Sequence, residues 1–351
     1  MTTNQRIRGM ATALPRTVLT NCELQKRFQD SQIGGFLQVT GIDERRCVAS
    51  GETASDLAVQ AAESLFHATG ADRSQIDALL FCSLTPDYKT PPTACLLQHR
   101  LGLSQNTCTF DLVQACPAFT HSLATSTSLL TCGVAKNVLL IHADSLTQFI
   151  HPLDRELVPI HGDGAIALWL QGDANGTVFD WFAFGTNGQQ ADRIIIPDGM
   201  GRHPVTSASL QEEKDEKGNV RTRTHLKMDG AAVFHFVIHT IPSFLRNACA
   251  EHNCTLDDYD LILFHQANKM IVDMLYNILK IPREKRFMYL EKVGNLSGAS
   301  LPFVLAQACR EKKLSAGSRV LMCGFGAGLS WGAVSLRWQE ELPVVPDHVF
   351  L

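Results

Sequence analysis

Cys116 lies where a predicted strand passes into a predicted helix. The apolar run from Thr109 to Val113 is typical of a buried strand, and a helical pattern follows from Pro117 to about Leu130. Proline fits the first turn of a helix, where its missing N–H is no loss. The dipole and the free N–H groups of a helix N-terminus favour the thiolate, which is the nucleophilic form of cysteine. Cys116 is therefore a candidate nucleophile, although a free cysteine is also often a small buried core residue.

Two polar side chains further along the chain also lie at strand or helix ends. His265 ends a predicted buried strand, and Gln266-Ala267-Asn268 then starts a helix. Asn295 lies in a turn of small residues that leads into a helix from Leu301. Each has a plain alternative, because a histidine can be a hydrogen-bonded core residue and an asparagine after glycine commonly makes a turn or a cap.

A glycine-rich loop follows a strand near the C-terminus. Gly324, Gly326 and Gly328 alternate with other residues, and glycine permits close approach of the backbone. The spacing differs from a dinucleotide fingerprint, and no helix clearly follows. The plain alternative is the turn of a final hairpin.

Composition limits the possible functions. At 351 residues the chain could hold about two domains. Its net charge of −4 gives no basic signature for nucleic acid, and no run approaches the ~18 apolar residues of a membrane span. The eleven cysteines include no C-x-x-C pair, which argues against a zinc site and a disulfide framework. We expect a cytoplasmic protein with unpaired thiols, no metal, no nucleic-acid partner and no membrane partner.

The second half of the chain repeats the plan of the first. Ile76 to Cys82 is echoed by Tyr259 to His265, and Val138 to Ala143 by Val320 to Phe325; the starting positions give offsets of 183 and 182 residues. Two echoes at nearly one offset indicate a duplicated α/β unit. We therefore expect two halves, 1–175 with the cysteine and 176–351 with the histidine and asparagine. The offset pairs Cys116 with the neighbourhood of Gly298.

The least regular segment, 207–224, is rich in charged residues. It is typical of a solvated surface excursion, with a mobile cover over a site entrance as the alternative.

Together these stretches resemble the β-ketoacyl-acyl-carrier-protein synthase III family of the thiolase superfamily, over most of the chain. The motifs that carry the resemblance are Asp111-Leu112 with Ala115-Cys116 and Phe119, His265-Gln266-Ala267-Asn268, Gly294 to Ser300, Gly324 to Gly332, Thr40-Gly41-Ile42, Thr85-Pro86-Asp87, Asp154-Arg155 and Gly162 to Ala165. The resemblance implies a five-layered α-β-α-β-α fold with two mixed sheets, usually as a homodimer.

The family's chemistry suits these residues. Cys116 would take an acyl group from a thioester primer. A malonyl thioester, which the resemblance implies is malonyl-acyl-carrier protein, would then lose carbon dioxide. His265 and Asn295 would stabilise the resulting enolate as hydrogen-bond donors, and the backbone N–H groups of Cys116 and Ala327 would hold the tetrahedral oxyanion. No cofactor is implied, since coenzyme A and carrier-protein thioesters are substrates.

The resemblance also implies substrate-binding roles for Thr40, Arg155, Asn268 and His161. Several neighbouring positions depart from the family pattern. Gly35 and Val39 stand where the family usually has a Trp and an Arg that clamp the adenine of coenzyme A, Met270 replaces an Arg, and His161 replaces an aromatic residue. These changes favour a longer or carrier-bound primer over acetyl-coenzyme A, as in relatives of secondary metabolism or fatty-acid salvage.

Two other functions stay open at this point. The same fold could move an acyl group from Cys116 to an alcohol or amine, although Asn295 favours decarboxylating condensation. The chain could also be a non-catalytic subunit of a heteromeric synthase, although such subunits would be expected to lose the cysteine or the histidine.

Overall fold

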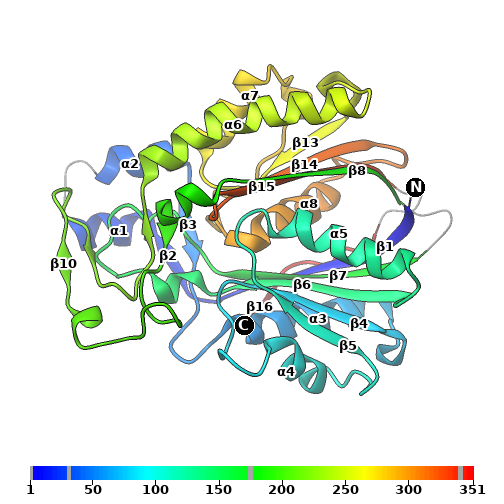
Figure 1. Ribbon diagram of the computed structural model, residues 1–351, viewed down its shortest axis with the longest axis horizontal. Coiled ribbons are helices and arrows are strands. Elements are labelled where there is room, and N and C mark those ends of the chain that lie inside the picture. The colour runs from blue at the N-terminus through cyan, green and yellow to red at the C-terminus, as the bar shows by residue number, and fades with distance from the viewer. Residues whose placement is uncertain (1–2, 30–32, 173–176, 339–342) are drawn as a thin grey trace.

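The computed structural model describes residues 3–29, 33–172, 177–338 and 343–351, and every statement below refers to these ranges (Figure 1). One hydrogen-bonded order, β13-β14-β15-β8-β1-β7-β6-β4-β5, joins the main strands, and β16 (Val349–Phe350) lies beside β1. The joint between β8 and β1 is short, pairing Thr3–Gln5 with Thr177–Phe179. The two mixed sheets expected from the sequence are therefore joined edge to edge.

The two sheets share one strand plan. The first contains β1 (Thr3–Leu14), β7 (Gly164–Gly172), β6 (Asn137–Asp144), β4 (Ala78–Cys82) and the edge strand β5 (Cys108–Leu112). The second contains β8 (Thr177–Thr186), β15 (Ser330–Arg337), β14 (Arg319–Gly326) and β13 (Leu261–Phe264). In each, a parallel pair is followed by two antiparallel pairs.

The strand registers match the repeat found in the sequence. Ala78 lies opposite Val138 in the first sheet, and Leu261 lies opposite Val320 in the second. These are the two pairs of echoed segments. The proposed boundary after residue 175 falls in 173–176, outside the described residues, so the division into 1–175 and 176–351 stays a prediction.

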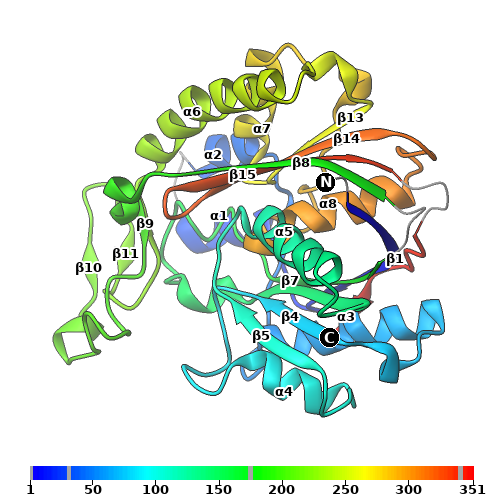
Figure 2. The same cartoon turned by 45° about the vertical axis from the view of Figure 1, so that its right-hand side comes forward.

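Helices and sheets alternate in five layers (Figures 1 and 2). The central layer contains α5 (Ala118–Thr131) and α8 (Ser300–Arg310), which contact strands of both sheets. Outside the first sheet lie α3 (Ala54–Thr69) and α4 (Thr93–Arg100), and outside the second lie α6 (Gly230–Glu251) and α7 (Lys269–Ile278).

Local sequence explains most of these elements. β4 and β6 are buried at every position, as a strand covered on both faces requires. All residues of α8 from Ser300 to Cys309 are buried, which suits a helix between two sheets. β5 differs from the buried strand expected from its apolar run, because it is the last strand of its sheet and is partly exposed along its length.

Two smaller units flank the layers near the α2 end of the molecule. One contains β2 (Val18–Thr20), α1 (Asn21–Phe28), α2 (Ile33–Thr40) and β3 (Glu44–Arg46). The other, residues 194–228, contains the charged segment 207–224 and is called the excursion below. In it β10 (Glu213–Lys214) pairs with β11 (Val220–Arg221), and β9 (Ile194–Ile195) pairs with β12 (Lys227–Met228). Among the described residues, no helix is both long and apolar enough to span a membrane.

Candidate active site

Cys116, His265 and Asn295 line one cavity of about 250 Å³. Cys116 lies in the turn between β5 and α5, His265 directly follows β13, and Asn295 precedes α8. Ala327, His161 and Ser297 line the same cavity. The fold thus brings together three side chains that the sequence singled out independently.

The nucleophile turn packs against the asparagine turn and the glycine loop. A Cβ added at Gly298 would lie 3.3 Å from the Ala115 carbonyl oxygen, so the two turns related by the sequence offset are neighbours. A Cβ at Gly324 would lie 2.7 Å from Cα of Pro117, and one at Gly326 would lie 2.8 Å from Sγ of Cys116. Glycine is required at both positions because the strand backbone touches the nucleophile turn.

The Cys116 sulfur experiences opposing effects. Burial raises its pKa to about 12, with a further increase from the negative charge of Asp144, whereas hydrogen bonds from the backbone N–H groups of Cys116 and Ala327 lower it. The expectation that the helix N-terminus makes Cys116 a thiolate is therefore outweighed by desolvation. The same two N–H groups are the predicted oxyanion donors, and both point at the sulfur.

His265 is a buried, uncharged imidazole. Burial lowers its pKa to about 3, and the neighbouring His161 contributes to the decrease because two protonated imidazoles would repel each other. Its ring meets Phe325 edge-on at 5.7 Å, and Nδ1 has no hydrogen-bond partner in the described part of the chain. A neutral ring in this cavity can donate one hydrogen bond without adding charge.

Asn295 is held so that its amide nitrogen remains available. Its Oδ1 accepts hydrogen bonds from the Ser297 backbone N–H at 2.9 Å and from the Ser300 hydroxyl at 3.2 Å. The backbone of Asn295 bridges to the 160–162 segment, through Asn295 N–H to Ile160 oxygen at 2.9 Å. With Oδ1 occupied, the Nδ2 hydrogens are the groups left to face the cavity.

His161 presents a hydrogen-bond acceptor to the same cavity. Its Nδ1 lies 3.1 Å from the carbonyl oxygen of Leu157, and because a carbonyl only accepts, Nδ1 carries the proton. Burial lowers the pKa of His161, which leaves Nε2 with a lone pair. His161 therefore complements His265 and Asn295, which are predicted to act as hydrogen-bond donors.

Asp144 is a site residue that the sequence reasoning missed. It is fully buried at the end of β6 and accepts hydrogen bonds from the backbone N–H groups of Leu84, at 2.7 Å, and Gly298, at 3.1 Å. It thereby ties the Leu84 wall of the cavity to the asparagine turn. A carboxylate directly after the apolar run that ends at Ala143 was the available signal.

A second cavity of about 270 Å³ adjoins the first. The two share lining residues, namely His161, Met228, Val233, Ala267, Ile271 and Asn295. The second also reaches Phe36 of α2, Lys217 of the excursion and Met270 of α7. Because Lys217 and Met270 are exposed, this cavity extends from the surface to residues that also line the first cavity.

Of the other three residues with a predicted substrate-binding role, one lines the second cavity and two line neither cavity. Asn268 lines the second cavity and caps α7, with Oδ1 accepting from the Ile271 N–H at 2.9 Å. Thr40 is buried, donates to the Leu37 carbonyl oxygen at 2.7 Å and lines neither cavity. Arg155 also lines neither cavity, and its guanidinium donates to the Lys217 carbonyl oxygen at 3.4 Å.

An aliphatic lobe extends the first cavity toward the excursion. It is formed by Leu146, Ile194, Ile195, Ile196, Leu226, Met228, Val233 and Val237. Most of these residues belong to β9, β12 or their neighbours, so the excursion builds a wall of the site as well as a surface. Within the described ranges, no three His, Cys, Asp or Glu side chains gather as a metal site.

Comparison with known proteins gives one consistent result. The chain matches the family described as 3-oxoacyl-[acyl-carrier-protein (ACP)] synthase III over residues 110–188 and its C-terminal counterpart over residues 249–338. A relative named beta-ketoacyl-[acyl-carrier-protein] synthase III, from Rhodopirellula baltica, is 33% identical and covers 95% of this chain and 98% of its own length.

Solved structures agree. A crystal structure of a 3-oxoacyl-(acyl-carrier-protein) synthase III has a TM-score of 0.92 at 34% identity and covers 95% of this chain and all of its own. A 3-oxoacyl-(acyl-carrier protein) synthase from Burkholderia xenovorans has a TM-score of 0.88 at 28% identity, covering 100% of this chain and 98% of its own.

Proposed function

This chain belongs to the 3-oxoacyl-[acyl-carrier-protein] synthase III family, and on that premise we propose that it condenses an acyl thioester with a malonyl thioester. It is an acyltransferase-type condensing enzyme that forms a β-ketoacyl product and releases carbon dioxide. The observation that carries the proposal is the single cavity shared by Cys116, His265 and Asn295.

The first half-reaction loads the primer on Cys116. The sulfur attacks the thioester carbonyl, the donor's C–S bond breaks, and the thiol proton passes to the departing donor sulfur. Because burial raises the pKa of Cys116 to about 12, proton loss accompanies attack instead of preceding it. The N–H groups of Cys116 and Ala327 would hold the oxygen that becomes negative.

The second half-reaction forms the carbon–carbon bond. The malonyl carboxylate leaves as carbon dioxide, and its bonding electrons enter an enolate whose oxygen takes hydrogen bonds from His265 and Asn295. The enolate carbon attacks the acyl-Cys116 carbonyl. The tetrahedral intermediate then expels the Cys116 sulfur, which takes up one proton from solvent.

The two other functions considered from the sequence are less favoured. Acyl transfer to an alcohol or amine forms no enolate, so it gives no role to the Asn295 amide that lines the cavity with Cys116. A non-catalytic subunit has no need for the complete set of three side chains with an adjoining route from the surface.

The primer is an acyl chain longer than acetyl. The cavity of about 250 Å³ would hold roughly eight water-sized groups, and its far end is aliphatic. The exposed Val39 and the open space around Gly35 lack the planar pair expected of a coenzyme A clamp, which favours a carrier-bound donor. All eleven cysteines are unpaired in the structure, which suits the reducing cytoplasm.

A mass-spectrometric loading assay tests this function. We expect one acyl mass on Cys116 after incubation with medium-chain acyl thioesters, and its loss in Cys116→Ala. Cys132→Ala, which removes an exposed thiol, is the matched control and keeps the adduct. Absence of any adduct across chain lengths, or an adduct that persists in Cys116→Ala, would refute the proposal.

A further inference from the structure

The second cavity, called the entrance cavity below, offers very little charge to a substrate. Among its described lining residues the only fully charged side chains are Glu156 and Lys217, since burial keeps His161 neutral. Apolar groups such as Phe36, Phe234 and Met270 make up most of the rest. A substrate with a negative group at this end of the route would therefore meet a single cation.

Lys217 lies at the tip of the hairpin formed by β10 and β11. Asp215 organises the turn, with its Oδ1 accepting from the backbone N–H groups of Lys217 at 3.0 Å and Asn219 at 2.9 Å. Gly218 has φ +85°, the left-handed region that favours glycine. The turn is thus built to hold position 217 in place.

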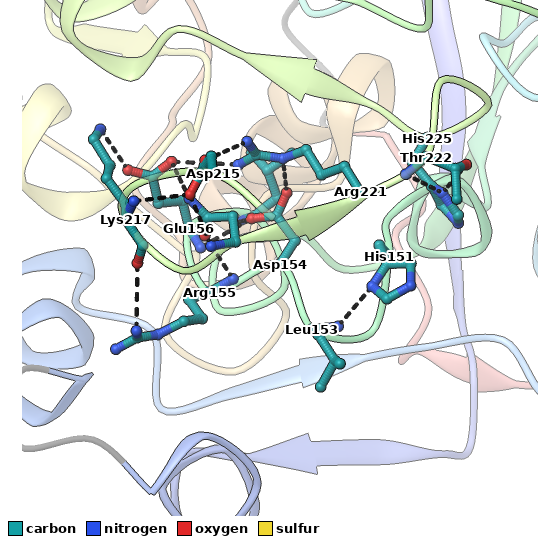
Figure 3. A network of polar contacts seen from close by, with 12 residues as sticks. His151, Leu153, Asp154, Arg155, Glu156, Asp215, Lys217, Arg221, Thr222 and His225 are labelled. Carbon is teal, nitrogen blue, oxygen red and sulfur yellow. Dashed lines mark hydrogen bonds and ion pairs between the residues drawn. The ribbon is translucent and has the colours of Figure 1, made fainter. Parts of the chain in front are cut away.

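A buried ion-pair network fixes this hairpin to the main body (Figure 3). Arg221, mostly buried, pairs with the fully buried Asp154, with Asp215 at 3.0 Å and with Glu156 at 3.3 Å. Figure 3 shows these carboxylates gathered around the Arg221 guanidinium, with Lys217 beside Glu156. Arg221 is therefore committed to the fold, whereas the Lys217 side chain is 71% exposed.

Arg155, to which the resemblance gives a substrate-binding role, contacts the turn that carries Lys217. Its guanidinium donates to the Lys217 carbonyl oxygen at 3.4 Å, and its backbone N–H donates to Oδ1 of Asn219 at 3.0 Å. A Cβ at Gly218 would lie 3.0 Å from the same guanidinium. Arg155 therefore contacts the backbone of the turn that carries the entrance cation, Lys217.

The Lys217 ammonium can change partners without leaving its present partner unpaired. Nζ lies 2.9 Å from Oε1 of Glu156. Oε2 of Glu156 also accepts from Nδ2 of Asn219 at 3.1 Å and from Arg221 at 3.3 Å. When Lys217 turns to an anion, Glu156 keeps two partners and the loss is small.

We propose that Lys217 binds the phosphate ester at the outer end of a donor's pantetheine arm. The inference rests on the proposed function, in which a thioester reaches Cys116 through the entrance cavity. Coenzyme A and a carrier protein present the same phosphate chemistry at the end of that arm. Lys217 would thus select phosphate-bearing donors at a site that lacks an adenine clamp.

A pair of donors that differ only in this phosphate provides the test. Acyl-4′-phosphopantetheine and acyl-pantetheine are compared by the second-order rate of Cys116 acylation. We expect the wild-type protein to prefer the phosphorylated donor by about fivefold, as one exposed ion pair allows. Lys217→Gln should abolish the preference by slowing only the phosphorylated donor.

Lys214→Gln is the matched control, because Lys214 is an exposed lysine of the same hairpin and does not line the entrance. It should leave the preference unchanged. Acyl-coenzyme A and acyl-carrier protein, run in parallel, identify which natural source of the phosphate depends more on Lys217. A preference that persists in Lys217→Gln overturns the inference alone, whereas a wild-type protein that accepts no donor overturns the proposed function itself.

Discussion

At the residue scale, the Cys116 sulfur is controlled by parts of the chain that are distant in sequence. Its own turn supplies one N–H, the glycine loop supplies another from Ala327, and Asp144 of β6 opposes both. Burial exceeds these effects and keeps the thiol protonated. We therefore expect Cys116 to lose its proton during attack on the thioester, because the free thiol is not ionised beforehand.

This balance predicts the pH dependence of Cys116 alkylation. A thiol with a pKa of about 12 gains thiolate about tenfold per pH unit, so the iodoacetamide rate should rise from pH 7 to pH 9.5 without levelling. An ordinary small thiol, with a pKa near 8.5, levels off in the same experiment. Peptide mass spectrometry follows Cys116, and a plateau at or below pH 9.5 would contradict the burial argument.

The amide donor of Asn295 is predicted to serve only the decarboxylation step. Asn295→Asp keeps an oxygen for the Ser297 and Ser300 bonds but removes Nδ2, and Asn295→Ala removes the whole amide. Both variants should still load the primer while carbon dioxide release falls by roughly 10²-fold or more. Release is measured with carboxyl-labelled malonyl thioester. Normal release from Asn295→Ala would refute the assigned role.

At the element scale, the charged excursion is part of the site. β9 and β12 supply the aliphatic lobe, and the β10–β11 hairpin supplies the entrance cation. Ion pairs attach the β10–β11 hairpin to the body, whereas β9 and β12 pack there through an apolar cluster. The charged composition of 207–224 alone predicts a solvated loop. The ion pair between Arg221 and the buried Asp154 shows that the hairpin is instead anchored to the body.

The anchor predicts unequal costs for two similar mutations. Arg221→Gln leaves the buried Asp154 without its ion-pair partner and should destabilise the protein by about 3 kcal/mol. Arg223→Gln breaks a pair with Asp198 in which the arginine is half exposed, and should cost about 1 kcal/mol or less. Denaturant unfolding compares the two variants, and trypsin cleavage within 197–228 reports on the segment itself. Equal losses would show that Arg221 is not the anchor.

At the scale of the whole molecule, β5 is an edge without a partner on its outer side in the described chain. It is the last strand at one end of the ten-stranded sheet, and Val113 directly after it is 74% exposed. An uncovered edge strand beside an apolar side chain is a pairing surface for another chain. We propose that a second copy pairs there and forms a homodimer.

Sedimentation tests the assembly directly. The wild-type chain should sediment at twice its monomer mass, and Val113→Asp should shift the distribution toward the monomer by placing charge beside the edge. Val134→Asp, at another exposed valine outside the strands, is the control and should remain dimeric. A wild-type protein that sediments as a single chain would contradict the homodimer.

The sequence by itself determined the duplicated α/β plan and the three residues at the cavity. The continuous apolar runs of β4, β6, β13 and β14 encode buried strands locally, and their common offset encodes the repeat. Cys116, His265 and Asn295 could be predicted because each lies at the end of such an element or in a turn of small residues, where a fold presents side chains to a site.

Only the tertiary structure decided what these residues experience and what surrounds them. The protonation of Cys116 depends on burial and on Asp144, which no local pattern reports. The exposure of β5 follows from its place at the sheet edge, and the position of Lys217 in the lining of the second cavity follows from a hairpin folding back over the 154–156 segment. Such properties depend on segments distant in sequence, whereas strand and helix patterns depend on neighbours along the chain.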